Sequence, residues 1–90
     1  MLIASSRIEN MIVPRQIRAA RALLAWSQEE LASRADVGTA TVKRIERNDD
    51  DMRGSIASLR KIEAALIGEG ISFSNDKNSV SVTLQLSATE

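Results

Sequence analysis

Residues 28–47 read QEELASRADVGTATVKRIER, and this stretch decides the fold of the chain. The spacing of its apolar residues fits two short amphipathic helices, over about Gln28–Ala35 and Thr39–Arg47. The residues from Ala35 to Gly38 fit a tight turn between them. The stretch therefore predicts a helix-turn-helix unit.

The start of the first helix carries two local signals. Ser27 and Glu30 have the spacing of a capping box, in which Ser27 accepts from the Glu30 amide and the Glu30 carboxylate reaches back to the Ser27 amide. Trp26 and Leu31 have the spacing of a hydrophobic staple across the same cap. Because both signals have a physical mechanism, they fix where this helix begins.

The second helix has one apolar face and one polar face. Val42 and Ile45 fall on the side expected to pack inward. A unit of this kind can place its second helix in the major groove of DNA. The outward side would then meet the groove with Thr39, Ala40, Lys43, Arg44 and Arg47.

Length and composition exclude several classes of protein. Ninety residues make one small domain with a modest core, so association with a second copy would add useful burial. The chain has no Cys and no His, which rules out disulfides and thiolate metal sites and removes the commonest general base. The acidic residues are scattered and there is no phosphate-cradling glycine-rich loop. We therefore expect no enzyme, no metal, no cofactor and no small-molecule ligand.

The sequence gives no sign of a membrane protein. No apolar run approaches the roughly 18 residues that a membrane helix needs. The opening residues 1–13, MLIASSRIENMIV, make a poor signal peptide because they lack a basic start and a long apolar block. The expected location is the cytoplasm.

The net charge is zero, whereas DNA binders usually carry a basic surface. The distribution is more favourable than the total, because cations concentrate in or beside the helix-turn-helix unit. They could equally be ordinary solvated helix faces. These cations are Arg15, Arg18, Arg21, Arg34, Lys43, Arg44 and Arg47, and the acids among them are Glu29, Glu30, Asp36 and Glu46.

Helices are also predicted on both sides of this unit. Residues 1–13 form an N-terminal extension that could include a short strand at 11–13. Pro14 suits the first turn of a helix running to about Ala25. Ser55 suits the N-cap of a helix that runs to about Ile67 and is followed by glycines. The expected inward residues are Ile17, Ala20, Leu23 and Leu24 in the first of these helices, and Ile56, Leu59, Ile62 and Leu66 in the other.

From Ile71 onward the apolar period changes to two, which indicates strands. Residues 75–78, NDKN, give a turn signal, so residues 71–90 predict a β-hairpin appended to a helical domain at 14–70. A lone hairpin is marginal in water, so it must pack on its own helices, pair with a partner's strand, or both. Its apolar face, a candidate dimerisation surface, consists of Val80, Val82, Leu84 and Leu86.

Residues 17–49, IRAARALLAWSQEELASRADVGTATVKRIERND, followed by 58–73, SLRKIEAALIGEGISF, resemble the Cro/XRE family of phage-repressor-like regulators. The resemblance implies a mainly α, lambda-repressor-like DNA-binding domain of four to five helices, here with a C-terminal β-hairpin or strand. The residues at family spacing are Gln28, Leu31, Ala32, Val37, Val42, Ile45 and Glu46.

The resemblance also implies roles for individual residues. Arg21 and Glu46 match a structural ion pair of this family. Phosphate contacts are implied at Ser27 and Gln28, where a helix N-terminus favours anions. Arg44 is placed to read guanine through O6 and N7. The remaining implied DNA contacts are base contacts by Thr39 and Ala40 with Lys43 nearby, phosphate contacts by Arg47 and Asn48, and Thr41 facing either the groove or the helix interface.

Three features depart from the family pattern. Asp36 stands where a turn glycine is common, but Asp tolerates left-handed geometry. Gly38 stands where Ser often caps the second helix. The acidic run Asp49–Asp51 would repel phosphate if it faced DNA.

Taken together, the sequence favours a DNA-binding transcriptional regulator that acts as a homodimer on double-stranded DNA. The alternative is a protein-interaction module on the same scaffold, similar to an antitoxin or a coactivator.

Overall fold

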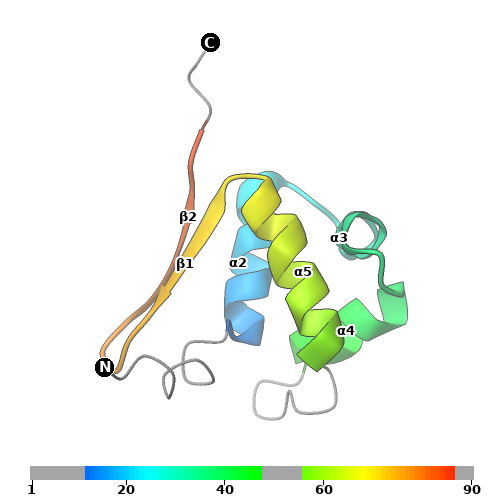
Figure 1. Cartoon of the computed structure of the whole chain (residues 1–90), viewed down its shortest axis with the longest axis horizontal. Coiled ribbons are helices and arrows are strands. Elements are labelled where there is room, and N and C mark those ends of the chain that lie inside the picture. The colour runs from blue at the N-terminus through cyan, green and yellow to red at the C-terminus, as the bar shows by residue number, and fades with distance from the viewer. Residues whose placement is uncertain (1–11, 48–55, 87–90) are drawn as a thin grey trace.

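The computed structural model describes residues 12–47 and 56–86 (Figure 1). The described part is mainly helical, with four helices followed by a two-stranded antiparallel hairpin, so the predicted fold class is confirmed. The elements are α2 (Pro14–Leu24), α3 (Gln28–Ala35), α4 (Thr39–Arg47), α5 (Ile56–Gly68), β1 (Ile71–Asn75) and β2 (Val80–Leu84).

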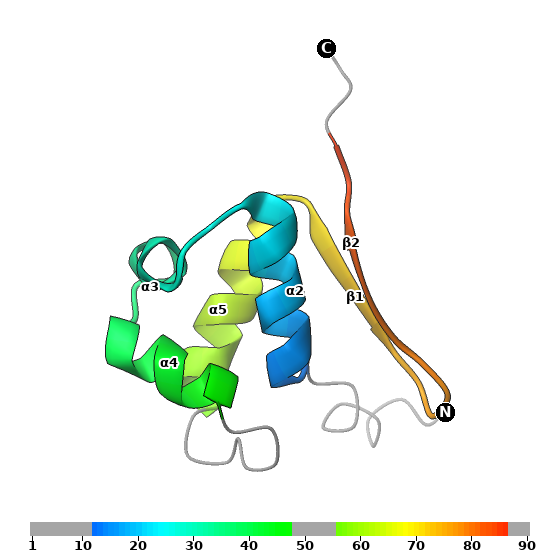
Figure 2. The same cartoon turned by 180° about the vertical axis from the view of Figure 1, so that it is seen from behind.

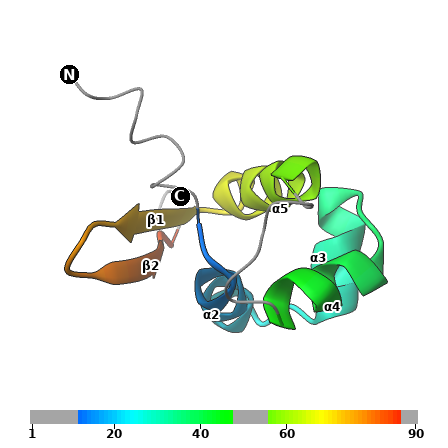
Figure 3. The same ribbon diagram turned by 90° about the horizontal axis from the view of Figure 1, so that it is seen from below.

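Helices α2 and α5 lie between the helix-turn-helix pair and the hairpin. The α3–α4 pair packs on one side of them and the hairpin lies on the other, as Figures 2 and 3 show from two directions. This arrangement separates the helix-turn-helix unit from the hairpin. A ligand on α4 and a partner on the hairpin would therefore approach different sides of the protein.

One apolar cluster joins all these elements. Ile17 of α2, Leu31 of α3 and Val42 of α4 meet Leu59, Ile62 and Leu66 of α5 in the fully buried centre. Ala32 of α3 is also buried, which suits a small side chain where α3 crosses α4. The burial of Ile17 and Val42, and of the three residues of α5, agrees with the predicted inward faces.

Three positions differ from the expected burial. Ile12 belongs to the core at 2% exposure, although it precedes the first helix. Leu23 and Ile56, both expected to face inward, are 47% and 46% exposed. Periodicity places a residue on a helix face but does not say how far a neighbouring element covers that face, and here the cover ends short of both side chains.

The hairpin packs on the domain through one face. Phe73, Val82 and Leu84 are partly buried against the core, while Val80 and Leu86 are 45% and 75% exposed. Part of the apolar face of the hairpin therefore packs on the helices of its own chain, which is one of the two expected arrangements. Residues 77 and 78 form the turn between the strands. A backbone hydrogen bond of 2.9 Å closes this turn, with the Asp76 amide donating to the Ser79 carbonyl.

A buried glutamine ties the hairpin to α2. Gln16 is 1% exposed, and its Nε2 donates to Asn75 Oδ1 at 2.5 Å and to the Ser81 carbonyl at 3.0 Å. Its Oε1 accepts from the Val13 amide at 3.0 Å, which also caps the start of α2. Because every polar atom of this side chain has a partner, its burial carries little penalty.

Candidate nucleic-acid interface

The N-terminus of α3 is capped by one half of the predicted capping box. The Oγ of Ser27 accepts from the Glu30 amide at 2.9 Å. The other half is wrong: the Glu30 carboxylate accepts from Arg34 Nε at 2.7 Å, one helical turn further on. A charged guanidinium is a stronger partner for a carboxylate than a backbone amide, which accounts for the difference.

Arg34 does not join the cationic surface that the charge distribution predicts. Its guanidinium carbon lies 4.8 Å from the centre of the Trp26 ring, and its Nη1 lies 3.4 Å from Glu69 on the loop after α5. Two carboxylates and one aromatic face thus surround this cation. It stabilises the start of α3 rather than adding positive charge to a ligand surface.

The turn between α3 and α4 has the geometry that its unusual residues allow. Asp36 adopts left-handed φ and ψ of 60° and 48°, and its amide donates to the Ala32 and Ser33 carbonyls. Val37 is partly buried against the core. The carbonyl of Gly38 accepts from the Thr41 and Val42 amides and starts α4. The turn therefore survives without the usual glycine at position 36.

Helix α4 has a buried side and an open side. Val42, Ile45 and Glu46 are buried against the domain. Thr39 and Thr41 at the start of the helix are partly exposed. The open side carries four exposed residues, of which three are cationic: Ala40, Lys43, Arg44 and Arg47.

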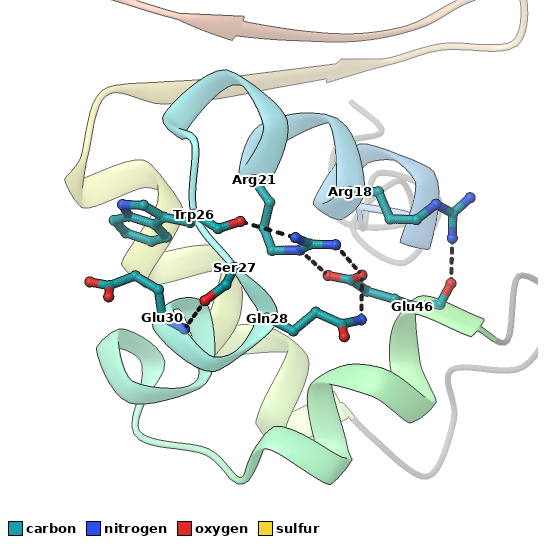
Figure 4. Close-up of polar contacts among 7 residues, drawn as sticks. All are labelled: Arg18, Arg21, Trp26, Ser27, Gln28, Glu30 and Glu46. Carbon is teal, nitrogen blue, oxygen red and sulfur yellow. Dashed lines mark hydrogen bonds and ion pairs between the residues drawn. The ribbon is translucent and has the colours of Figure 1, made fainter.

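Glu46 links α4 to the other two helices of the site (Figure 4). Arg21 Nε and Nη2 donate to its two carboxylate oxygens at 2.7 and 2.9 Å, in a bidentate pair. Gln28 Nε2 donates to the same carboxylate at 3.0 Å. Arg21 also donates to the Trp26 carbonyl at 3.0 Å. One carboxylate on α4 thus holds side chains from α2 and α3.

Both side chains of this pair are largely shielded from solvent. The Glu46 side chain is 4% exposed and that of Arg21 is 20% exposed. Hydrogen bonding to the Glu46 carboxylate raises the pKa of the Arg21 guanidinium above its ordinary value, against the opposing effect of burial. The Arg21 guanidinium therefore stays charged against the buried Glu46 side chain, which lies away from the open side of α4.

A further arginine supports the end of α4, in a role that no sequence pattern indicated. Arg18 Nη1 donates to the main-chain carbonyl of Glu46 in the last turn of the helix (Figure 4). A cation is favourable there because the last carbonyls of a helix carry partial negative charge. A shallow depression beside it joins α2, α3 and α4, and is lined by Arg18, Arg21, Gln28, Lys43, Glu46 and Arg47.

The structure brings most of the predicted DNA contacts to this one side of the domain. Ser27 is exposed and Gln28 partly exposed at the start of α3, and Gln28 lines the same depression as Lys43 and Arg47. Asn48 and the acidic run Asp49–Asp51 lie outside the described residues. Strand β2, which contains three of the four predicted dimerisation residues, lies on the other side of α2 from α4 (Figure 3).

Comparison with known proteins agrees with this geometry. Residues 17–67, more than half of the chain, match the model of the helix-turn-helix family, and the match spans α3, the turn and α4. A search of curated proteins finds no match. In residues 12–47 and 56–86, no helix is long and apolar enough to cross a membrane. The same residues include no group of three side chains suited to hold a metal ion.

Proposed function

This chain belongs to the Cro/C1-type helix-turn-helix family of DNA-binding regulators, the XRE family, and we propose that it reads specific DNA sequences through α4. The family is one of regulatory DNA-binding domains and not of enzymes. In the proposed complex, α4 enters the major groove of double-stranded DNA and its exposed residues meet the base edges.

The observation that carries this proposal is the open cationic side of α4. Lys43, Arg44 and Arg47 are exposed, while the opposite side of the same helix is buried. The only acid within α4, Glu46, is buried and neutralised by Arg21. The exposed side of this helix is therefore positive although the chain as a whole has no net charge.

Different residues perform different parts of the recognition. Arg44 donates to guanine O6 and N7, while Thr39 and Ala40 are small enough to meet a thymine methyl group. Ser27 and Gln28 bind a backbone phosphate at the N-terminus of α3, where orphan amides and the helix dipole favour an anion. The phosphate contacts set the position of α4, and the base contacts choose the sequence. The proposed contact surface also includes Thr41, Lys43, Arg47 and Asn48.

A single domain of this size reads few base pairs, so we propose that two copies bind together. A two-fold dimer places its two recognition helices on half-sites about one helical turn apart. The hairpin is the element proposed to hold the copies, because it lies on the side of α2 away from α4 (Figure 3). Its candidate residues are Val80, Val82, Leu84 and Leu86.

Selection of bound sequences from a random DNA pool tests this function directly. We expect an enriched motif with two-fold symmetry. The affinity for that motif should fall along a straight line in a plot of log affinity against log salt concentration, because binding releases counterions. Failure to retain any sequence at low salt would overturn the proposal and favour the protein-interaction alternative.

A further inference from the structure

An open groove runs between α2 and β2, on the hairpin side of the domain. Ala19, Ala22 and Leu23 of α2 form one wall, and Val80 and Val82 of β2 contribute to the other. Leu23 and Val80 are 47% and 45% exposed, so a lone copy leaves two large apolar side chains of this groove in water. The two alanines leave room beside α2 for a further stretch of backbone.

One edge of β2 has no strand beside it among residues 12–47 and 56–86. Backbone bonds join Asp76 to Ser79 at the turn and Gln85 to Gly70 at the other end of the hairpin. Hydrogen-bonded and non-hydrogen-bonded pairs alternate between these ends. The alternation turns the peptide groups of three β2 residues toward the open edge: Val80, Val82 and Leu84.

The turn end of the groove is positively charged. Arg15 of α2 and Lys77 of the turn line it, and neither has an ion-pair partner in the described part of the chain. The neighbouring Asp76 carboxylate already accepts from the Asn78 and Ser79 amides. An occupant of the groove should therefore be an extended strand with alternating apolar residues and an acidic residue at the turn end.

We propose that this groove receives residues 84–90 of a second copy of the chain, paired antiparallel to β2. Those residues read LQLSATE, with Leu84, Leu86 and Ala88 alternating with polar residues and with Glu90 following at the same spacing. An antiparallel strand runs toward the turn of the first copy, so its acidic end arrives beside Arg15 and Lys77. This pairing is the interface of the dimer proposed above, and it rests on that proposed dimer.

A two-fold axis at Leu84 satisfies both the backbone and the side chains. In this register the second copy's Leu86 lies opposite Val82, its Ala88 lies opposite Val80, and its Glu90 reaches the turn. These residues alternate along the strand in step with Val80, Val82 and Leu84, whose peptide groups point to the open edge. The two strands can therefore exchange backbone hydrogen bonds. Their side chains fall on the face that turns toward α2. Leu86, which is 75% exposed in one copy, is thereby covered by the groove of the other.

The mass of the full chain in solution, measured by light scattering over a concentration series, tests the interface. We expect a dimer that dissociates on dilution. Leu86→Asp should raise the dissociation constant at least about tenfold, because it places a carboxylate in an apolar groove. Gln85→Asp is the matched control: it adds the same charge one residue earlier, on the opposite and polar face of the strand, and should leave the dimer intact. A monomeric wild type, equal weakening by both variants, or no effect of Leu86→Asp would each overturn the proposal.

The absence of native cysteines allows a clean test of the register. Two Leu84→Cys residues related by the axis would have Cα atoms about 5.5 Å apart, within the range that a disulfide bridges. Two Thr83→Cys residues would be diagonal neighbours at about 7–8 Å, which a disulfide does not span without movement. We expect oxidation to cross-link the Leu84→Cys protein much faster than the Thr83→Cys protein. The reverse order, or equal rates, would overturn the register.

DNA binding by Leu86→Asp separates this interface from the proposed function. The variant should keep its affinity for a single half-site, because α4 is unchanged, and lose affinity for the two-fold site. A wild type that dimerises as described but binds no DNA would leave the interface standing and remove only the DNA-binding function.

Discussion

Arg21 Nε lies 2.7 Å from Glu46 Oε2, and this pair joins the first helix of the domain to the recognition helix. The same Glu46 carboxylate accepts from Gln28 on α3. Three helices thus share one charge centre, which fixes the position of α4 on the domain. Because Glu46 is buried, its removal should affect the stability of the fold more than a surface ion pair would.

Glu46→Gln should lower the free energy of unfolding by about 2–3 kcal/mol, because it leaves a partly buried guanidinium without its counter-charge. Urea unfolding followed by circular dichroism measures this change. Glu30→Gln is the control, since the Glu30–Arg34 pair is exposed to solvent and its loss should cost clearly less than the loss of Glu46. Equal losses in the two variants would contradict the structural role given to Glu46.

Arg44→Ala and Arg47→Ala should weaken DNA binding in different ways. Loss of a bidentate base contact should cost about 1–3 kcal/mol and relax the preference at one base pair. Loss of Arg47, a phosphate contact, should weaken all sequences alike and reduce the salt slope by about one. Titration of the selected site and its single-base variants distinguishes the two patterns. If neither change alters DNA affinity, the surface assigned to DNA is incorrect.

Gly38→Ser should stabilise the protein. Gly38 does not have a positive φ, and a Cβ there would meet only Thr41 Oγ1, at 3.8 Å. A serine would cap α4 with its hydroxyl and restrict the unfolded chain, for a gain of about 0.5–1 kcal/mol.

Thermal unfolding of Gly38→Ser, compared with Gly70→Ser, checks this expectation. Gly70 has φ of 100°, and a Cβ there would lie 2.9 Å from the Gln85 carbonyl oxygen. The same substitution should therefore raise the melting temperature at position 38 and lower it at position 70. A fall at position 38 would show that the start of α4 differs from the described geometry.

The hairpin turn should loosen in acid. Hydrogen bonds from the Asn78 and Ser79 amides lower the pKa of the Asp76 carboxyl below its ordinary value of 3.8. A carboxyl whose pKa is lowered by folding stabilises the fold at pH values above its unfolded pKa, and this contribution disappears as the pH falls through the folded pKa.

Amide NMR shifts of Asn78 and Ser79, recorded from pH 6 downward, follow this titration. We expect a transition with a midpoint below 3.8. Asp76→Asn keeps an acceptor oxygen and should retain the turn but lose the transition. A midpoint at or above the ordinary value would show that these bonds do not form in solution.

The sequence by itself determined the helix-turn-helix unit, because its signals are local. Ser27 identified the start of α3, and Val42 and Ile45 identified the buried face of α4 through helical periodicity alone. The change to a period of two predicted the hairpin from Ile71 onward. Such features depend on residues a few positions apart, whose relative geometry the backbone fixes.

Only the tertiary structure decided which polar groups meet across the chain. Gln16 shows no signal in the sequence, yet it is buried because Asn75 and Ser81 reach it from 59 and 65 residues away. Arg18 caps α4 in the same way, through a carbonyl that periodicity does not locate. Leu23 is likewise exposed because no neighbouring element in the described part of the chain covers its side chain. A local pattern determines the direction in which a side chain points, but the packing of distant elements determines what it contacts.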